Sequence, residues 1–260
     1  HVLPQLFIWR ALSESGKTFV DVQITHRGDV AQVYLPKARE AYDGHIPPID
    51  FHAADTDKLS TIFPSIPPAV FSLFLFPHGD ANIAMLVALF VMSGVIFLAL
   101  YGLGTLLTGD RVLGILFGFL GTLTPLLSGL PKAFTSVDNF LNLALKHFIP
   151  FVSTKLDKLF LDRIDDPLLT YPFYFLALAA LVWYWHWPQK KTAIAAGVLS
   201  GLLAYVYFHY WAYVMLVIGV LCIYLLVVQK EQRERLGTFV WLLGSLAVTF
   251  IPYAISYFRF

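Results

Sequence analysis

The sequence predicts an all-α fold, a polytopic transmembrane helical bundle with extracytoplasmic loops that carry short surface helices. Hydrophobic residues make up 58% of the 260 residues and charged residues only 13%, whereas soluble domains are about half apolar and a quarter charged. Between Lys191 and Lys230 there is no Lys, Arg, Asp or Glu, and this stretch is long enough for two spans of about 17–20 residues. A third observation, the gathering of basic residues on short loops, predicts the orientation of these spans.

The two spans of this long apolar stretch are expected at about 192–208 and 211–228. The residues between and around them, Tyr205–Tyr213, are rich in aromatic rings, which favour the headgroup level of a bilayer. We therefore expect the chain to turn there. Basic residues stand at both open ends of the hairpin: Lys190, Lys191, Lys230, Arg233 and Arg235. The open ends are accordingly predicted to be cytoplasmic and the turn, with His209, extracytoplasmic.

The N-terminal part, residues 1–64, is predicted to be an extracytoplasmic loop region. Residues 1–13 are apolar but too short to cross a bilayer, and we interpret them as the outer end of a first span. Because the chain starts at His1 and stops within an apolar run, we expect further sequence at both ends. Within the loop, a helical segment should end near Asp43-Gly44, although Pro36 makes an unbroken helix there uncertain.

Residues 65–260 are predicted to form the bundle itself. Besides the hairpin, spans are expected at about 65–76 (a short one), 82–108, 112–130, 168–187 and 236–253. A tight turn at Gly109–Arg111 should join two of them, and Pro125 should kink the outer part of 112–130. Residues 131–166 form an outer loop with amphipathic segments on the membrane surface. Following the spans outward from the hairpin places Arg111 inside, and residues 14–64 and 131–166 outside.

Composition and motifs exclude several functions. A net charge of +1 gives no basis for binding nucleic acid, and the single cysteine, Cys222, excludes an intrachain disulfide. The sequence has no Gly-rich phosphate loop, no G-x-S-x-G and no HExxH motif. What remains is a set of acidic and histidine side chains in the two outer loops. Such carboxylates serve as general bases or cation ligands, but they are equally typical of solvated loops, and the residues alone leave both readings open.

Three motifs carry a resemblance to a known family. The first loop contains Asp29-x4-Tyr34-x2-Lys37-Ala-Arg39-Glu40-x2-Asp43-Gly44, followed by Ile62-Phe-Pro64-Ser-Ile-Pro-Pro68. Arg163-Ile-Asp-Asp-Pro167-x-x-Thr170-x-Pro172 leads into a span, and Gly201-Leu-Leu-Ala-Tyr205-x-Tyr207-x-x-Tyr210-Trp211 forms the aromatic hairpin. Together they resemble the GT-C-type polytopic membrane glycosyltransferases, in particular the bacterial members that use polyisoprenyl-phosphate sugars.

The resemblance implies transfer of a hexose or pentose from a polyisoprenyl-phosphate donor, on the extracytoplasmic side of the plasma (inner) membrane. The partners implied are this donor and membrane lipid. Asp29 would be the catalytic base that accepts a proton from the acceptor group. The substrate-binding candidates are Arg163, Arg39, Glu40, Asp43, His209 and Tyr210. Arg163 leads because a guanidinium pairs with phosphate in a bidentate fork, although an ion pair with Asp162, Asp165 or Asp166 is an equally open interpretation.

Metal dependence stays open within the resemblance. A divalent cation, Mg²⁺ or Mn²⁺, is a possible cofactor, and Asp55 and Asp57 have the spacing of a metal-binding pair. They stand nearer the following span than the family pattern leads one to expect. If the interpretation is right, Asp29 and Arg163 should face one outer cavity, about one sugar-phosphate length apart.

Two other functions compete with glycosyl transfer. A lipid or sugar transporter, or a flippase-like protein without transferase activity, would also be polytopic, but ion-coupled transporters carry charged sites near the bilayer midplane. Here every Asp, Glu, Lys and Arg falls in a loop or at the end of a predicted span. A purely structural membrane subunit is the third reading, and the acidic outer loops count against it.

Overall fold

The computed structural model describes residues 2–18, 34–45, 65–75, 79–122, 168–227 and 233–258. Helices make up 89% of these residues and no strand occurs among them, which confirms the all-α class. The helices are α1 (Val2–Glu14), α3 (Leu35–Tyr42), α4 (Ile66–Leu75), α5 (Ala81–Thr108), α6 (Arg111–Thr122), α10 (Tyr171–His186), α11 (Lys190–Val206), α12 (Phe208–Val227) and α13 (Arg233–Phe258).

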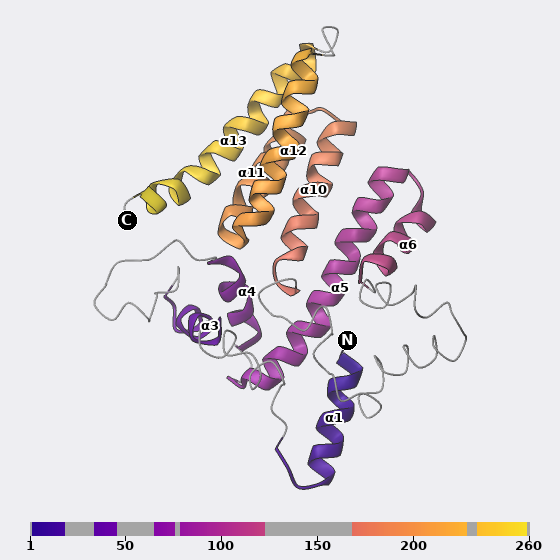
Figure 1. The fold of residues 1–260 in the computed structure, drawn as a ribbon, viewed down its shortest axis with the longest axis vertical. Helices are drawn as coiled ribbons and strands as arrows, with labels where there is room; N and C mark the ends of the chain where they lie inside the picture. The colour runs from indigo at the N-terminus through magenta and orange to yellow at the C-terminus, as the bar shows by residue number, and fades with distance from the viewer. Residues whose placement is uncertain are drawn as a thin grey trace.

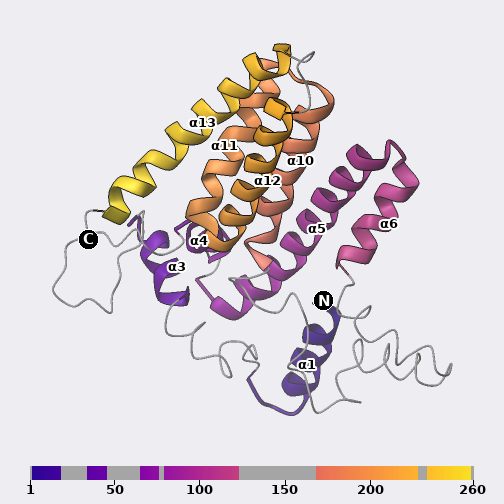
Figure 2. The same ribbon diagram turned by 45° about the horizontal axis from the view of Figure 1, so that its top comes forward.

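The long helices run up and down beside one another, so that the bundle has two distinct ends (Figure 1). At the basic end, α5 turns into α6, α10 turns into α11, and α13 begins. This end carries Arg111, Lys190, Lys191 and Arg235. At the aromatic end lie α3, α4, the first turn of α10 and the junction of α11 with α12 (Figure 2). The chain changes direction at Tyr207, which is extended between α11 and α12 and lies within the aromatic stretch where a turn was expected.

In the described part of the chain, three helical segments are long and apolar enough to cross a membrane: Ala81–Thr108, Phe208–Val227 and Arg235–Ile255. Helices α10 and α11, with 16 and 17 residues, reach about 24–26 Å at 1.5 Å per residue, slightly less than the hydrocarbon core of about 30 Å. Large apolar side chains stand outward, as Leu216 at 69% and Val227 at 72% exposure illustrate on α12. The chain is therefore a membrane protein by the length and composition of its helices, and the full set of seven spans stays a prediction.

Local sequence signals explain where the helices begin and end. The Asp80 carboxylate accepts the Asn82 N–H at 2.8 Å and so caps α5, and Asp110 accepts the Val112 N–H at 2.6 Å at the start of α6. Gly109 ends α5 with a φ of +70°, a backbone conformation that suits glycine. Pro36 lies in the first turn of α3, where a missing N–H costs nothing, so it starts this helix rather than breaking it.

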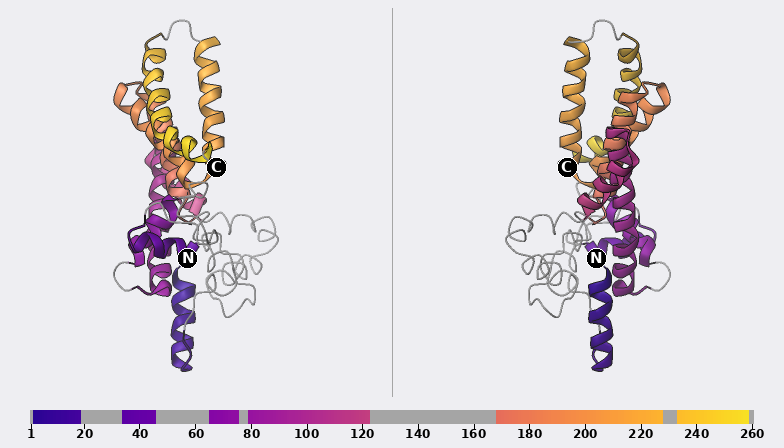
Figure 3. Two further views of the ribbon diagram at one scale, coloured as in Figure 1. Left: turned by 90° about the vertical axis from the view of Figure 1, so that its left-hand side faces the viewer. Right: turned by 90° about the vertical axis from the view of Figure 1, so that its right-hand side faces the viewer.

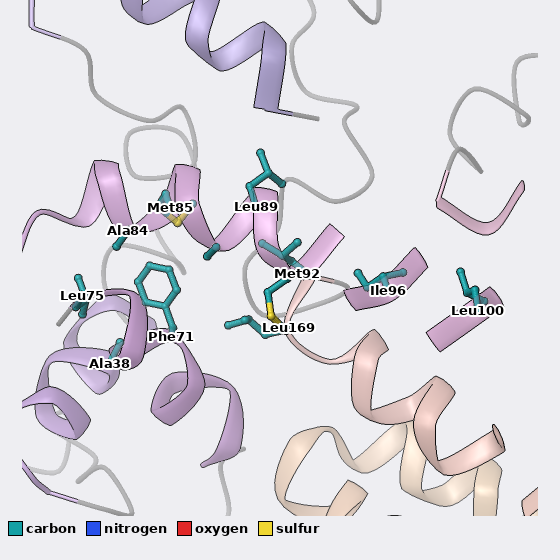
Figure 4. Packing of buried hydrophobic residues seen from close by; sticks show 12 residues of the cluster. Ala38, Phe71, Leu75, Ala84, Met85, Leu89, Met92, Ile96, Leu100 and Leu169 are labelled. Carbon is teal, nitrogen blue, oxygen red and sulfur yellow. The ribbon is translucent and has the colours of Figure 1, made fainter. Parts of the chain in front are cut away.

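One buried cluster attaches α3 and α4 to the bundle. Ala38 of α3 and Phe71 and Leu75 of α4 lie against the N-terminal half of α5, and Leu169 closes the cluster from the chain that enters α10 (Figure 4). Phe71 is only 1% exposed, and burying such a side chain contributes about 1.5–3 kcal/mol. The two short helices are thus held to the bundle by packing rather than lying loose on its surface.

A second cluster joins α10, α11, α12 and α13. Its closest contact is between α11 and α13, where Gly197 and Gly201 face α13 without a Cβ between the two backbones. Tyr184, which is 2% exposed, ties α10 to the start of α13 because its hydroxyl donates to the Arg235 carbonyl at 3.2 Å. Helix α1 stands apart from this cluster and extends beyond the aromatic end, where it contacts α5 (Figure 3).

Candidate functional site

Four of the predicted site residues lie outside the described residues. These are the predicted base Asp29, the predicted phosphate ligand Arg163, and the metal candidates Asp55 and Asp57. Their roles, and the expected shared cavity of Asp29 and Arg163, stay predictions. Helices α6 and α10 stand before and after the second outer loop. The C-terminal end of α6 and the N-terminal end of α10 both lie away from the basic end of the bundle (Figure 1).

The charged candidates on α3 form ion pairs on its surface. Arg39 Nε donates to Asp43 Oδ2 at 2.9 Å, and His45 Nδ1 lies 2.8 Å from Glu40 Oε2. The hydrogen bond from Arg39 to Asp43, together with the charge of that carboxylate, raises the pKa of the guanidinium above its usual value. The side chain of Arg39 is 62% exposed. In this arrangement Arg39, Glu40 and Asp43 engage neighbours on their own helix or just beyond its end, and do not converge on a shared cavity.

Lys37 is the charged residue that sequence reasoning did not assign to the site. It is only 3% exposed, and it is the one charged residue that is buried among those the structure describes. It shares a buried face of α3 with Ala41, one turn later, and with Ala38. Charged side chains are almost never fully buried without a polar or ionic partner. In the sequence Lys37 stands out only as a member of the motif that carries the family resemblance, and its burial follows from the packing of α3.

An aromatic cluster surrounds Tyr210 at the aromatic end. The Tyr210 ring lies 4.8 Å from the ring of Tyr174, 4.9 Å from that of Tyr207 and 5.7 Å from that of Tyr171. His209 is exposed beside it, with its ring 5.3 Å from Tyr207. The first turns of α10 and α12 thus meet in one group of rings. Such rings offer flat faces for sugars and equally anchor helices at the headgroup level.

Next to this cluster, a pair of stacked rings joins α12 to α13. Trp211 stacks on Phe250 of α13, with ring centroids 4.5 Å apart and planes within 11° of each other. The indole Nε1 is buried and has no hydrogen-bond partner among the residues that the structure describes. A buried indole N–H normally finds an acceptor, so this donor is an additional polar group that a bound hydroxyl or phosphate oxygen would satisfy.

Helix α4 connects the charged and aromatic parts of the aromatic end. It packs against α3 on one side, and just before its start the Ser65 N–H donates to the Tyr205 carbonyl at the end of α11, at 3.0 Å. The buried Lys37 and the Tyr210 cluster therefore belong to one connected framework. Helices α3 and α4 and the first turns of α10 and α12 lie at the end of the bundle opposite the first turns of α11 and α13 (Figure 2).

The described part of the chain contains no group of three or more His, Cys, Asp or Glu side chains that would hold a metal ion. The question of a divalent cation therefore falls on residues such as Asp55 and Asp57, outside that part. Comparison with known proteins adds no assignment, since no protein-family model, curated protein or solved structure matches this chain.

Proposed function

We propose that this protein is a membrane glycosyltransferase that moves a sugar from a polyisoprenyl-phosphate donor to an acceptor on the extracytoplasmic side. The donor tail would lie between helices, its phosphate at the aromatic end, and the acceptor would be deprotonated by Asp29. The proposal rests on the motifs of the sequence, and the arrangement of the described helices supports it.

The observation that carries the proposal is that the short loops with basic residues lie at one end of the bundle and the described parts of the first outer loop at the other. Arg111, Lys190, Lys191 and Arg235 lie at one end, as expected of cytoplasmic loops. The described parts of the first outer loop, α3 and the residues before α4, lie at the other end together with the aromatic cluster. A transferase that acts outside the membrane requires this sidedness.

Lys37 is the described residue we assign to the donor phosphate. An ammonium that is removed from water interacts more strongly with an anion than an exposed one, because the local dielectric is lower. The exposed ion pair of Arg39 and Asp43 offers no such advantage. In this proposal Lys37 binds the phosphate with Arg163, and Tyr210 contributes a ring face for the sugar.

The transporter alternative draws no support from the long helices. Helices α5, α10 and α12 contain no Asp, Glu, Lys or Arg. Ion-coupled transport normally needs such groups near the midplane. A flippase-like protein would need none, and it is distinguished from a transferase by its product.

The test uses the full-length protein and a radiolabelled polyisoprenyl-phosphate sugar. Wild type should transfer label to an acceptor, whereas Asp29→Asn should lower the rate by about 10²–10⁴-fold, the range for loss of a general base. Lys37→Gln should raise KM for the donor, because it removes the charge that binds phosphate. The matched control is Asp110→Asn, which preserves a cap at the opposite end of the bundle and should leave the rate unchanged.

Each outcome has a definite meaning. Transfer that persists in Asp29→Asn would remove Asp29 as the base. Label that moves across the bilayer without becoming attached to an acceptor would replace the transferase proposal with a flippase. A loss of rate in Asp110→Asn equal to that in Asp29→Asn would show that the assay reports folding rather than chemistry.

A further inference from the structure

A cavity of about 310 Å³ lies between the C-terminal end of α1 and the N-terminal end of α5, away from the Tyr210 cluster. Trp9, Ile83 and Leu86 form an apolar wall, and Lys17 and Asp80 supply opposite charges. Among the described residues, no ion pair joins Lys17 to Asp80. Within the described part of the chain, the Lys17 ammonium and the Asp80 carboxylate thus line the cavity without forming an ion pair with each other.

Backbone motifs fix the main-chain positions of Lys17 and Asp80. At the end of α1, Gly16 has a φ of +69°, and the Lys17 N–H donates to the Leu12 carbonyl at 2.8 Å, as in a Schellman motif. At the start of α5, one oxygen of Asp80 accepts the Asn82 N–H. The second oxygen of Asp80 has no protein donor among the described residues. Two helix ends therefore bring the solvent-exposed side chains of Lys17 and Asp80 to the lining of the same cavity.

The position of the cavity indicates where its ligand comes from. It lies at the end of α5, the longest of the membrane-spanning candidates, at the level where a span leaves the hydrocarbon region. Trp9, which is 43% exposed, is the kind of residue that belongs at this level. A lipid headgroup is the ligand that is always present there, with its acyl chains able to follow the apolar surface of α5.

We propose that this cavity binds the headgroup of a zwitterionic phospholipid with a primary amine, such as phosphatidylethanolamine. Lys17 would bind the phosphate, and the free oxygen of Asp80 would accept a hydrogen bond from the ammonium. A primary ammonium has N–H donors for a carboxylate, which the quaternary ammonium of a choline lipid lacks. The inference needs only that α5 crosses the membrane and does not depend on glycosyl transfer.

The test measures which lipid remains bound to the full-length protein. The protein is reconstituted into phosphatidylcholine nanodiscs that contain equal minor fractions of phosphatidylethanolamine and phosphatidylglycerol, and bound lipid is identified by native mass spectrometry after release. Wild type should retain phosphatidylethanolamine in preference to both other lipids. Asp80→Asn should lower this preference about tenfold, as expected when a charge-assisted hydrogen bond to the ammonium is lost. Lys17→Gln should instead lower the retention of all three lipids, because each of them carries the phosphate that Lys17 binds.

The variants are chosen so that folding is preserved. Asn is as good an N-cap as Asp, so Asp80→Asn removes the charge and leaves the cap of α5. Arg10→Gln is the matched control, because Arg10 is an exposed cation on α1 that pairs with Glu14 and does not line the cavity. It should leave both the amount of retained lipid and the lipid preference unchanged, and Lys17→Arg should retain lipid as wild type does.

Three results would overturn the proposal. One is equal retention of all three lipids by wild type, and another is undiminished lipid retention in Lys17→Gln together with an undiminished preference in Asp80→Asn. The third is displacement of the lipid by an equal concentration of soluble glycerophosphoethanolamine, since this would show a site for a free phosphate ester rather than for a lipid. Because the readout is lipid binding, none of these results bears on the transferase assay.

Discussion

Replacing Gly197 with alanine should destabilise the contact between α11 and α13. A Cβ at this position would overlap Ser245 Oγ and the Leu242 carbonyl oxygen of α13. One obstacle is backbone, so no side-chain rotation can relieve the clash. Four residues later, a Cβ on Gly201 would lie 2.7 Å from Thr249 Cβ and 3.0 Å from the Leu246 carbonyl oxygen. Small residues at this spacing let membrane helices approach closely.

The magnitude follows from two opposing effects. At Gly201 the contact with Thr249 Cβ would have to lengthen by about 0.7 Å to reach ordinary van der Waals distance, and at Gly197 the helices must separate further. Overpacking of this kind costs about 1–3 kcal/mol, while alanine gains up to about 1 kcal/mol of helix propensity over glycine. We expect Gly197→Ala to lower the free energy of unfolding by about 1–2 kcal/mol, equivalent to a Tm about 3–6 °C lower for a chain of this size.

The assay is thermal unfolding of the detergent-purified protein, followed by tryptophan fluorescence. Gly219→Ala on α12 is the matched control, because a Cβ there meets nothing within 4 Å, and it should leave Tm unchanged or raise it slightly. Ser245→Ala removes one of the two obstacles and should restore part of the stability of Gly197→Ala. Equal Tm values for Gly197→Ala, Gly219→Ala and wild type would refute the close α11–α13 packing.

Two further predictions concern single contacts. Tyr184→Phe should lower Tm by about 2–4 °C, because it removes the buried hydroxyl that donates to the Arg235 carbonyl, at a cost of about 1 kcal/mol. The control is Tyr213→Phe, at a residue that is 61% exposed. Equal shifts of Tm in the two variants would contradict the role of the Tyr184 hydroxyl. Asp43→Asn should leave Tm and the rate of sugar transfer unchanged at physiological salt, because Asp43 pairs with an exposed arginine and solvent screens this ion pair. Loss of transferase activity in Asp43→Asn would instead favour the substrate-binding role that the sequence suggested.

The helices could be predicted closely from the sequence, since each signal for them is local. The apolar run from Asn82 to Thr108 predicts α5 to within a residue. The aromatic stretch around Tyr207 predicts the junction of α11 and α12. The sequence was least decisive at α3, where Pro36 left an unbroken helix uncertain; Pro36 lies in the first turn of this helix, a position at which proline is favoured.

The candidate site could be predicted only in part. Arg39, Glu40 and Asp43 were selected for their charge, yet their side chains pair on the surface of α3 and its end. Lys37, two residues earlier, is the buried one. Which side of a short helix faces the bundle depends on the partner that packs against it, here α4, and this partner follows only after a long loop in the sequence.

The sequence by itself determined that this is an all-α membrane protein and where its long helices lie. The physical reason is that a helix in a bilayer must satisfy its own backbone hydrogen bonds, so a long uncharged run suffices to define it. The tertiary structure alone decided which helices touch, because helices such as α5 and α12 are apolar on every side and no face of them is marked in advance for packing. It therefore took the three-dimensional arrangement to show the glycine contact of α11 with α13, the burial of Lys37, and the charged cavity where α1 meets α5.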